Sequence, residues 1–313
     1  MLTGLLIDAH RPTLPDLLPG VPLARAPAAS TNVDRVQSDL LAVLFALASA
    51  LTIAWGTVVR HGIAVSAPAG SSPMLTAIQK PMWWAGMSTA IIAYGLQVVA
   101  LSFGPLLLVQ PFLVMSLMFT LPLSAAYSKR RMSWAEIMWS TLLTAAVVVV
   151  LVLGRPIGGE DQPPIQRWIP ALLIGMVVLS GIYQLGARSD KRRRALLQGL
   201  VTGAIFGYVS VLSKAVADNF NLGGFSGLFT AWELYALILA ATVGTWVQQN
   251  AFNAGALRTS LPAMKIGEPI VAFTLGYAVL LERFQAVDWE WIGMGAALAV
   301  MVLSTVVLSR KSL

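Results

Sequence analysis

Residues 265 to 284 read KIGEPIVAFTLGYAVLLERF. The stretch is apolar enough for a membrane-spanning helix, which needs about 20 apolar residues to cross a hydrocarbon core about 30 Å thick. Lys265, Glu268 and Pro269 nevertheless lie inside it. A charge at that depth is costly, and a proline removes a helical hydrogen bond. The stretch therefore predicts a membrane helix that carries a polar site.

The chain as a whole has the composition of an integral membrane protein. Of its 313 residues, 57% are hydrophobic and 11% are charged, and the mean hydropathy is +0.75. A spanning segment must satisfy its own backbone polar groups, so we expect an all-α fold. Nine apolar runs have a suitable length and are bounded by charge, glycine or proline; they cover residues 40–60, 83–102, 105–127, 134–153, 168–186, 195–216, 229–251, 259–281 and 288–309.

Several function classes are disfavoured by the composition. The chain has no cysteine, which excludes a disulfide framework, a thiolate metal site and a cysteine nucleophile. It has no HExxH, GxSxG or phosphate-binding glycine-rich motif, and we expect neither an enzyme nor a cofactor or metal site. The net charge of +7 does not indicate nucleic-acid binding, because the basic residues lie in short loops between apolar runs.

Residues 1–38 are expected to form a disordered tail ahead of the first span. This segment contains five prolines and no periodic apolar pattern. It begins with MLTGLL, which is soon followed by Asp8 and has no positive region before it. That order argues against a cleaved signal peptide.

The lysines and arginines of alternate loops predict the orientation in the plasma membrane. Seven lie on the side of the amino terminus and thirteen on the side of the carboxyl terminus. The positive-inside rule then places the carboxyl terminus in the cytoplasm and the amino terminus outside. The basic run RSDKRRR at 188–194 is interpreted as a cytoplasmic topology anchor. A further span within residues 64–82 would reverse the orientation predicted for the amino terminus.

Weak similarity between the two halves of the chain predicts an inverted repeat. A shift of 153 residues aligns SALTIAWGTV (49–58) with TGAIFGYVSV (202–211), and a shift of 151 pairs Gln97 with Gln248 and Pro111 with Pro262. We expect four helices in residues 39–153, a linker with one helix in 154–190, and four helices in 191–313. Because five helices separate the starts of the two units, the second unit enters from the opposite side of the membrane.

The polar site in the eighth span is expected to bind a transported species. Lys265 and Glu268 are three residues apart and share a helix face, so each offsets part of the other's burial cost. Pro269 leaves the carbonyl group of Lys265 without its helical partner, which predicts a broken or kinked helix. The alternative is a structural ion pair that locks the helix.

Amide side chains are further candidates for the binding site. Gln248, Gln249 and Asn253 lie at the end of the seventh span, and Gln97 is the repeat partner of Gln248. Amides offer both donors and acceptors and can line a hydrophilic path. They can equally well bond neighbouring helices to one another.

Two aromatic residues and a glycine stripe complete the set. Trp55 and Tyr208 are paired by the repeat and are weaker binding candidates. Gly199, Gly203 and Gly207 are spaced four residues apart, which predicts that another helix packs closely against them.

Two parts of the sequence resemble the drug/metabolite transporter superfamily of the EamA type. They are IGEPIVAFTLGYAVLLERFQAVDWEWIGMGAALAVMVLS (266–304) and AWGTV (54–58). The middle of the chain is closer to the NIPA-type magnesium transporters of that superfamily, through WWAGMSTAIIAYGLQVVALSFGPLLLVQP (83–111) and QQNAFNAGALRTSLPA (248–263). The resemblance covers about residues 40–310 and implies an inverted-repeat carrier. Lys265 departs from the NIPA-type pattern, and a lysine repels a divalent cation.

The sequence thus predicts a secondary transporter that moves a small polar or amphipathic solute by alternating access. The alternatives are a magnesium transporter of NIPA type, a lipid-linked flippase and a non-transporting membrane scaffold. The expected partners are the solute and the lipid bilayer, a homodimer is left open, and no nucleic-acid partner is expected.

Overall fold

The structure is a computed structural model that describes residues 32–65, 81–127, 129, 131–253 and 257–311. Residues 32–36 group with the amino-terminal residues, and residues 37–313 form one compact unit, to which the following description refers. Two predictions lie mostly outside the described residues. They are the disordered tail in residues 1–38 and the additional span in residues 64–82.

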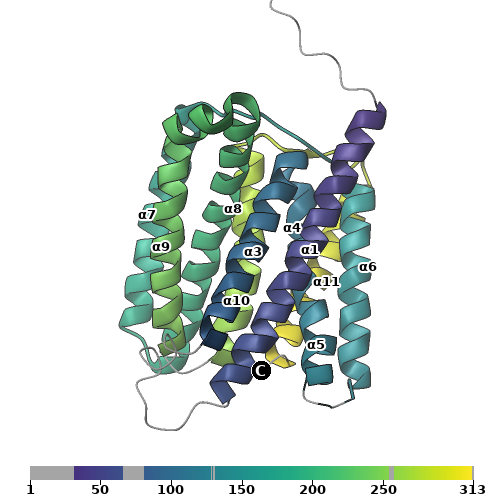
Figure 1. Ribbon diagram of the computed structural model, residues 1–313, viewed down its shortest axis with the longest axis vertical. Helices are drawn as coiled ribbons and strands as arrows, with labels where there is room; N and C mark the ends of the chain where they lie inside the picture. Colours follow the sequence, from purple (N-terminus) through teal and green to yellow (C-terminus); the bar gives the residue numbers. More distant parts are fainter. Residues whose placement is uncertain (1–31, 66–80, 128, 130, 254–256, 312–313) are drawn as a thin grey trace, which may run out of the picture. The chain divides into compact units, whose positions relative to one another are not determined.

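Almost all of the compact unit is helical (Figure 1). The two strands, β1 (Pro156–Ile157) and β2 (Arg283–Phe284), pair antiparallel. The all-α prediction is therefore confirmed in the described part of the chain. The helices there are α1 (Asn32–Val65), α3 (Pro81–Phe103), α4 (Leu106–Val114), α5 (Ser116–Tyr127), α6 (Trp134–Gly154), α7 (Ile165–Ala187), α8 (Lys191–Thr230), α9 (Trp232–Asn253), α10 (Leu257–Ala278) and α11 (Glu290–Lys311).

Each of the nine predicted spans corresponds to helical structure, with α4 and α5 together forming the third. This confirms the prediction of a multi-pass membrane protein, while the assignment of α3, α9 and α10 as full spans stays a prediction. By length and apolarity, six helical segments of the described residues are able to cross a membrane: Val33–Val59, Leu106–Tyr127, Trp134–Gly154, Ile165–Ala187, Lys191–Thr230 and Glu290–Arg310.

Two helices are longer than the sequence predicts. Helix α1 begins at Asn32, so residues 32–38 are helical and do not belong to a disordered tail. Asp34 in its first turn favours this start, because a negative charge stabilises a helix amino terminus. Helix α8 continues from the predicted end at residue 216 to Thr230, bending at Gly224, where φ is 57° and ψ is −146°. Glycine adopts such a conformation at little steric cost.

Of the two forms predicted at Pro269, a broken or a kinked helix, the break is not found, and a kink there stays a prediction. Helix α10 runs without interruption through Pro262 and Pro269. A proline removes one hydrogen bond but has a φ close to the helical value, so the packing of α10 against α8 can hold the helix together. The chain is interrupted instead at Met115, between α4 and α5.

The glycine stripe of α8 makes the predicted close helix contact, and its partner is α10. A Cβ atom added to Gly203 would lie 2.3 Å from the carbonyl oxygen of Met264, which is far inside contact distance. The same construction at Gly199 and Gly207 meets the carbonyl oxygens of Ser260 at 2.6 Å and of Glu268 at 2.8 Å. The prediction is confirmed, and it fixes which face of α10 is turned toward α8.

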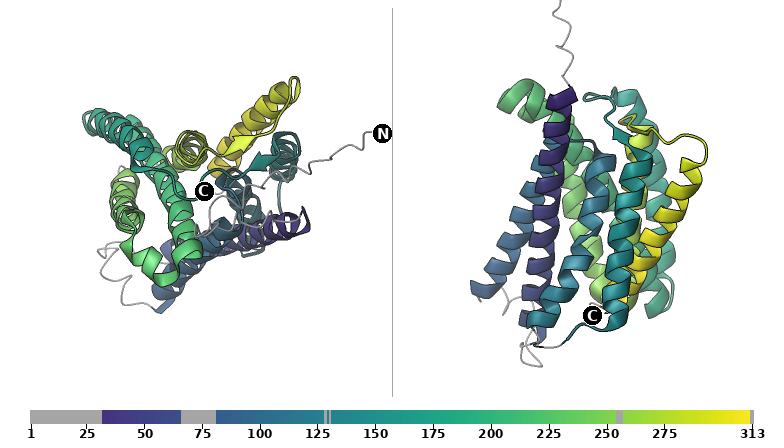
Figure 2. Two further views of the ribbon diagram at one scale, coloured as in Figure 1. Left: turned by 90° about the horizontal axis from the view of Figure 1, so that it is seen from above. Right: turned by 90° about the vertical axis from the view of Figure 1, so that its right-hand side faces the viewer.

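Helix α8 is central to the packing of the unit (Figure 2). It contacts α3, α7, α9 and α10, and this region holds the larger apolar core, with Leu101, Leu106, Leu212 and Ala272 among its buried members. A second core joins α5, α6 and α11. Because lipid is as apolar as these side chains, close packing rather than exclusion of water stabilises such contacts.

The loops of the unit lie at two ends (Figure 1). The α3–α4 turn, the β1–β2 pair and the segment after α10 lie at one end. The α7–α8 turn and the carboxyl end of α11 lie at the other end. At the first end the linker between the halves is fastened to the segment after α10, because the amide of Glu160 donates to the carbonyl oxygen of Leu280 at 2.7 Å and Arg155 pairs with Glu290.

Candidate functional site

A small cavity brings together four helices around the charged residues of α10. Its volume is about 80 Å³. Lys265, Glu268 and Pro269 line it from α10, and Gln97 lines it from α3. The remaining lining residues are Ile53 of α1 and Gln110, Leu113 and Val114 of α4. Because the opposite face of α10 is packed on the α8 glycines, these charged side chains face α3 and α4.

Lys265 and Glu268 share this cavity without closing an ion pair. Both residues are half-buried, and the charge of Lys265 acts on the Glu268 carboxyl group. Among the contacts of the described residues, however, none of 4.0 Å or less joins the two charged groups. An isolated charge within a membrane helix costs several kcal/mol. The two side chains offset part of that cost for each other while each keeps polar atoms available to a third group.

Two amides extend the polar lining. Gln97 donates from Nε2 to Ser210 Oγ on α8 at 3.4 Å. Gln110 is only 1% exposed, and its Nε2 has no hydrogen-bond partner in the described part of the chain. A buried donor without a partner is unfavourable by about 1–3 kcal/mol. A polar occupant of the cavity would relieve that cost.

A second cavity of about 140 Å³ adjoins the first, and Ile53 and Gln97 line both. It lies between α1 and α3 and is also lined by Thr52, Thr89 and Tyr94. The Tyr94 hydroxyl group is hydrogen-bonded to Ser213 on α8. Hydroxyl, amide and charged groups therefore follow one another from the α1–α3 interface to Glu268.

The other predicted site residues lie outside this cavity. Trp55 is 54% exposed, and Gln249 is exposed on α9. Gln248 on α9 contacts Met264 Sδ at 4.0 Å. Tyr208 donates to the carbonyl oxygen of Ala171 at 2.6 Å and lines a separate apolar cavity between α7, α8 and α10. The side chain of Asn253 lies outside the described residues.

The sequence interpretation missed Gln110 and Tyr94. Gln110 is an amide in the middle of the apolar run at 105–127, directly before Pro111. Charge at bilayer depth is the strong sequence signal for a polar site, and an uncharged amide there gives a weaker one. Among the described residues, no group of three or more His, Asp or Glu side chains could hold a metal ion.

Comparison with known proteins gives one close and several distant relatives. The chain is 62% identical over 281 residues to an uncharacterized protein of Corynebacterium glutamicum, covering 88% of this chain and 97% of that protein. It is 26% identical over 224 residues to the probable magnesium transporter NIPA1 of Arabidopsis thaliana, covering 68% of this chain and 65% of that protein. For a probable magnesium transporter of Candida albicans the identity is 25% over 228 residues, covering 66% of this chain and 61% of that protein.

No family profile and no solved structure matches the chain. The NIPA-type relationship is distant, and this chain spans less than two thirds of the length of those transporters. The chain therefore belongs to the same family as the uncharacterized protein of Corynebacterium glutamicum, a family of multi-pass membrane proteins distantly related to the NIPA-type probable magnesium transporters.

Proposed function

We propose that the protein is a secondary transporter of the drug/metabolite type that moves a small polar or amphipathic solute by alternating access. The observation that carries the proposal is the cavity in which Lys265 and Glu268 face Gln97 and Gln110 inside a helix bundle. Ionisable residues within membrane segments are rare and are usually retained for a substrate or ion pathway. The distant relationship to proteins named as transporters supports the same class.

The predicted inverted repeat is compatible with the position of this cavity. The shift of 151 residues places Val114 opposite Lys265, and both line the cavity. The interruption between α4 and α5 at Met115 falls at the repeat position of the charged pair. Transporters built from such repeats bind solute near the midplane, at discontinuous helices. We propose that α4–α5 and α10 are repeat-related walls of one binding site.

Magnesium transport is the second candidate, because the distant relatives carry that name. Mg²⁺ prefers oxygen ligands and retains several waters. Glu268 and the amide oxygens of Gln97 and Gln110 offer such ligands, but Lys265 at the same cavity opposes a divalent cation. We therefore place a solute with its own negative or zwitterionic group ahead of Mg²⁺.

Reconstituted protein tests the class and the solute. Purified protein is screened by thermal shift against metals, amino acids, nucleosides and lipids, and the stabilising compounds are then measured for uptake into liposomes. We expect protein-dependent uptake of at least one organic solute that is lost in Glu268→Gln. Uptake of Mg²⁺ alone would favour the second candidate, and neither binding nor uptake of any compound would contradict transport.

The orientation proposed from the basic loops is tested by reporter fusions after residues 157, 190 and 313. The first two positions flank α7, a helix of spanning length whose ends lie at opposite ends of the bundle (Figure 1). We expect a cytoplasmic signal at 190 and 313 and an external signal at 157. If 157 and 190 report the same side, α7 does not cross the membrane and the inverted repeat is wrong.

A further inference from the structure

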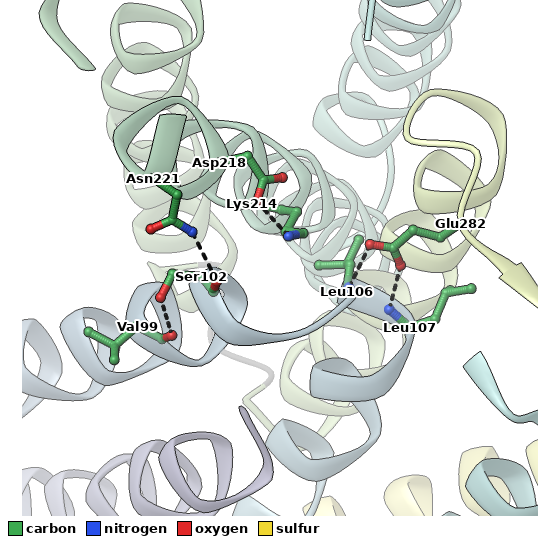
Figure 3. Close-up of polar contacts among 8 residues, drawn as sticks. All are labelled: Val99, Ser102, Leu106, Leu107, Lys214, Asp218, Asn221 and Glu282. Atoms are coloured by element: carbon green, nitrogen blue, oxygen red, sulfur yellow. Dashed lines mark hydrogen bonds and ion pairs between the residues drawn. The ribbon is translucent and has the colours of Figure 1, made fainter. Parts of the chain in front are cut away.

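A second polar cluster lies at the end of the bundle that holds the α3–α4 turn (Figure 3). Its centre is Glu282, which follows α10 and is 1% exposed. Glu282 Oε1 accepts from the amide of Leu106 at 2.7 Å, and Oε2 accepts from the amide of Leu107 at 2.8 Å. One carboxylate from the second half of the chain thus binds the first turn of α4 in the first half.

Helix α4 depends on this distant carboxylate for its cap. Its own N-cap residue is Pro105, whose side chain makes no capping hydrogen bond. The first amides of a helix have no partner within the helix, and they carry the positive end of its dipole. Glu282 supplies both the acceptors and the negative charge. The contact therefore joins the segment after α10 to the start of the helix that presents Gln110 to the central cavity.

Protonation changes what Glu282 can bind. An ionised carboxylate accepts at both oxygens, whereas a protonated carboxyl group turns one of them into an O–H donor. A donor facing a backbone N–H cannot form a hydrogen bond with it. A proton on Glu282 therefore weakens one of the two bonds to α4 and removes the charge that attracts the helix dipole.

The charged groups around Glu282 come from α8 and from the linker after β1, where Gly159 packs against the Glu282 backbone and Asp161 lines the adjoining cavity. Lys214 Nζ donates to Asp218 Oδ1 at 2.6 Å, and Asp218, which is 4% exposed, has no partner for Oδ2 among the described residues. From α4, the amides of Leu106 and Leu107 face the Glu282 carboxylate, and from α10 the uncharged Gly276 lies next to it. Burial raises the pKa of Glu282 from 4.5 to about 7, against the lowering effect of the α4 amides and Lys214; Asp218 adds to the rise.

A polar cavity that could admit water lies beside this cluster. A cavity of about 300 Å³ is lined by Gly104 and Pro105 of the α3–α4 turn and by Lys214 and Asp218 of α8. Asn221 also lines it and donates to the carbonyl oxygen of Ser102 at 2.9 Å. The cavity therefore adjoins the α3–α4 turn, directly before the α4 amides that Glu282 binds.

We propose that Glu282 is the binding site of a coupling proton, and that its protonation releases the start of α4 and opens this end of the bundle. The coupling role rests on the proposed transport function. The unprotonated carboxylate keeps the two halves joined at this end, and Lys214 and Asp218 set the charge around it. Movement of α4 then reaches the central cavity through Gln110, Leu113 and Val114.

Proton binding is measured by pH-difference infrared spectroscopy of the protein in liposomes. We expect a component of the protonated-carboxyl band that titrates near neutral pH and is lost in Glu282→Gln. The matched control is Glu136→Gln, which removes another buried carboxylate that accepts from the start of a helix, here through the Ser133 amide at 2.8 Å. The control should keep the band. Persistence of the same band in Glu282→Gln would overturn the proposal.

Release of α4 is measured in the same preparation by labelling one cysteine, since the natural chain has none. Leu107→Cys places it at a position that is 1% exposed, and its maleimide labelling rate is divided by that of free cysteine at the same pH. From about pH 8 to about pH 6 we expect this ratio to rise by up to about tenfold, following the protonated fraction of a group with a pKa of about 7.

In the background of Glu282→Gln the ratio should be high and independent of pH, because glutamine also presents a donor to the α4 amides. In the background of Glu136→Gln the response to pH should be retained. Two results with Glu282→Gln would overturn the proposed release. One is a labelling ratio that is low at every pH, and the other is a ratio that still changes with pH as in the parent. Both measurements need no solute, so they succeed or fail separately from the uptake assay that tests transport.

Discussion

Replacing Gly203 by leucine is expected to destabilise the folded bundle strongly. A Cβ atom at this position would lie 2.3 Å from the carbonyl oxygen of Met264 and 2.9 Å from its Cα atom. Both are backbone atoms of α10, so no flexible side chain can move away. Gly199 and Gly207 also hold α10 within contact distance one turn to either side, and α10 cannot shift at one point without losing those contacts. We expect a loss of about 3 kcal/mol, at the upper end for overpacked interiors.

The measurement is the yield and melting temperature of the detergent-purified protein, followed by size-exclusion chromatography. Gly181→Leu is the matched control, because Gly181 lies inside α7 and a Cβ added there meets no atom within 4 Å. The control should remain monodisperse and at least as stable as the parent, since leucine favours a helix interior over glycine by about 1 kcal/mol. Equal behaviour of the two variants would show that the α8–α10 contact does not hold the fold.

The helical fold was predictable from the sequence because its signals are local. Each spanning run is long and apolar, and the bilayer leaves a helix as the only simple backbone structure for it. The spacing of Gly199, Gly203 and Gly207 predicted a close helix contact, although only the structure identifies α10 as the partner. The inverted repeat remains a prediction, because the similarity between the halves is weak.

Other features depend on tertiary contacts that leave no local signal. The extension of α8 beyond residue 216 crosses a polar sequence in which the side chains of Asn219 and Asn221 find partners on other segments, while Asp218 pairs with Lys214 one turn earlier in the same helix. The cap of α4 comes from Glu282, 175 or more residues away along the chain. Spacing along the chain cannot identify a helix so distant in sequence as the partner of Glu282.

The candidate site was only partly predictable for the same reason. Lys265, Glu268 and Gln97 were found from charge, depth and the repeat, and they line one cavity. Gln248 and Tyr208 were grouped with them by similar sequence arguments but form contacts elsewhere. Membrane amides and hydroxyl groups serve helix packing as often as binding, and spacing along a helix does not reveal which neighbour a side chain faces.

Replacing Glu268 by glutamine is expected to abolish solute uptake while the protein stays folded. Glutamine keeps the size of the side chain and most of its hydrogen-bonding capacity, but it removes the charge and the titratable group. Glu268 closes no ion pair of 4.0 Å or less among the described residues, so its replacement breaks no direct contact with Lys265, although Lys265 loses the charge that offsets part of its burial cost. The measurement is uptake into liposomes at several pH values beside a thermal melt. A folded variant with the uptake of the parent and its pH dependence would remove Glu268 from the site.

The central claim is that Lys265 and Glu268 bind the transported species, and the double variant Lys265→Met/Glu268→Gln tests it most directly. If the pair were only a structural lock, either single variant would leave one buried charge unpaired and lower the stability of the fold by about 3–5 kcal/mol. The double variant would then restore both stability and transport. We predict instead that the double variant is folded, with a melting temperature close to that of the parent, and takes up no solute into liposomes. Uptake by the double variant at the rate of the parent would contradict the account.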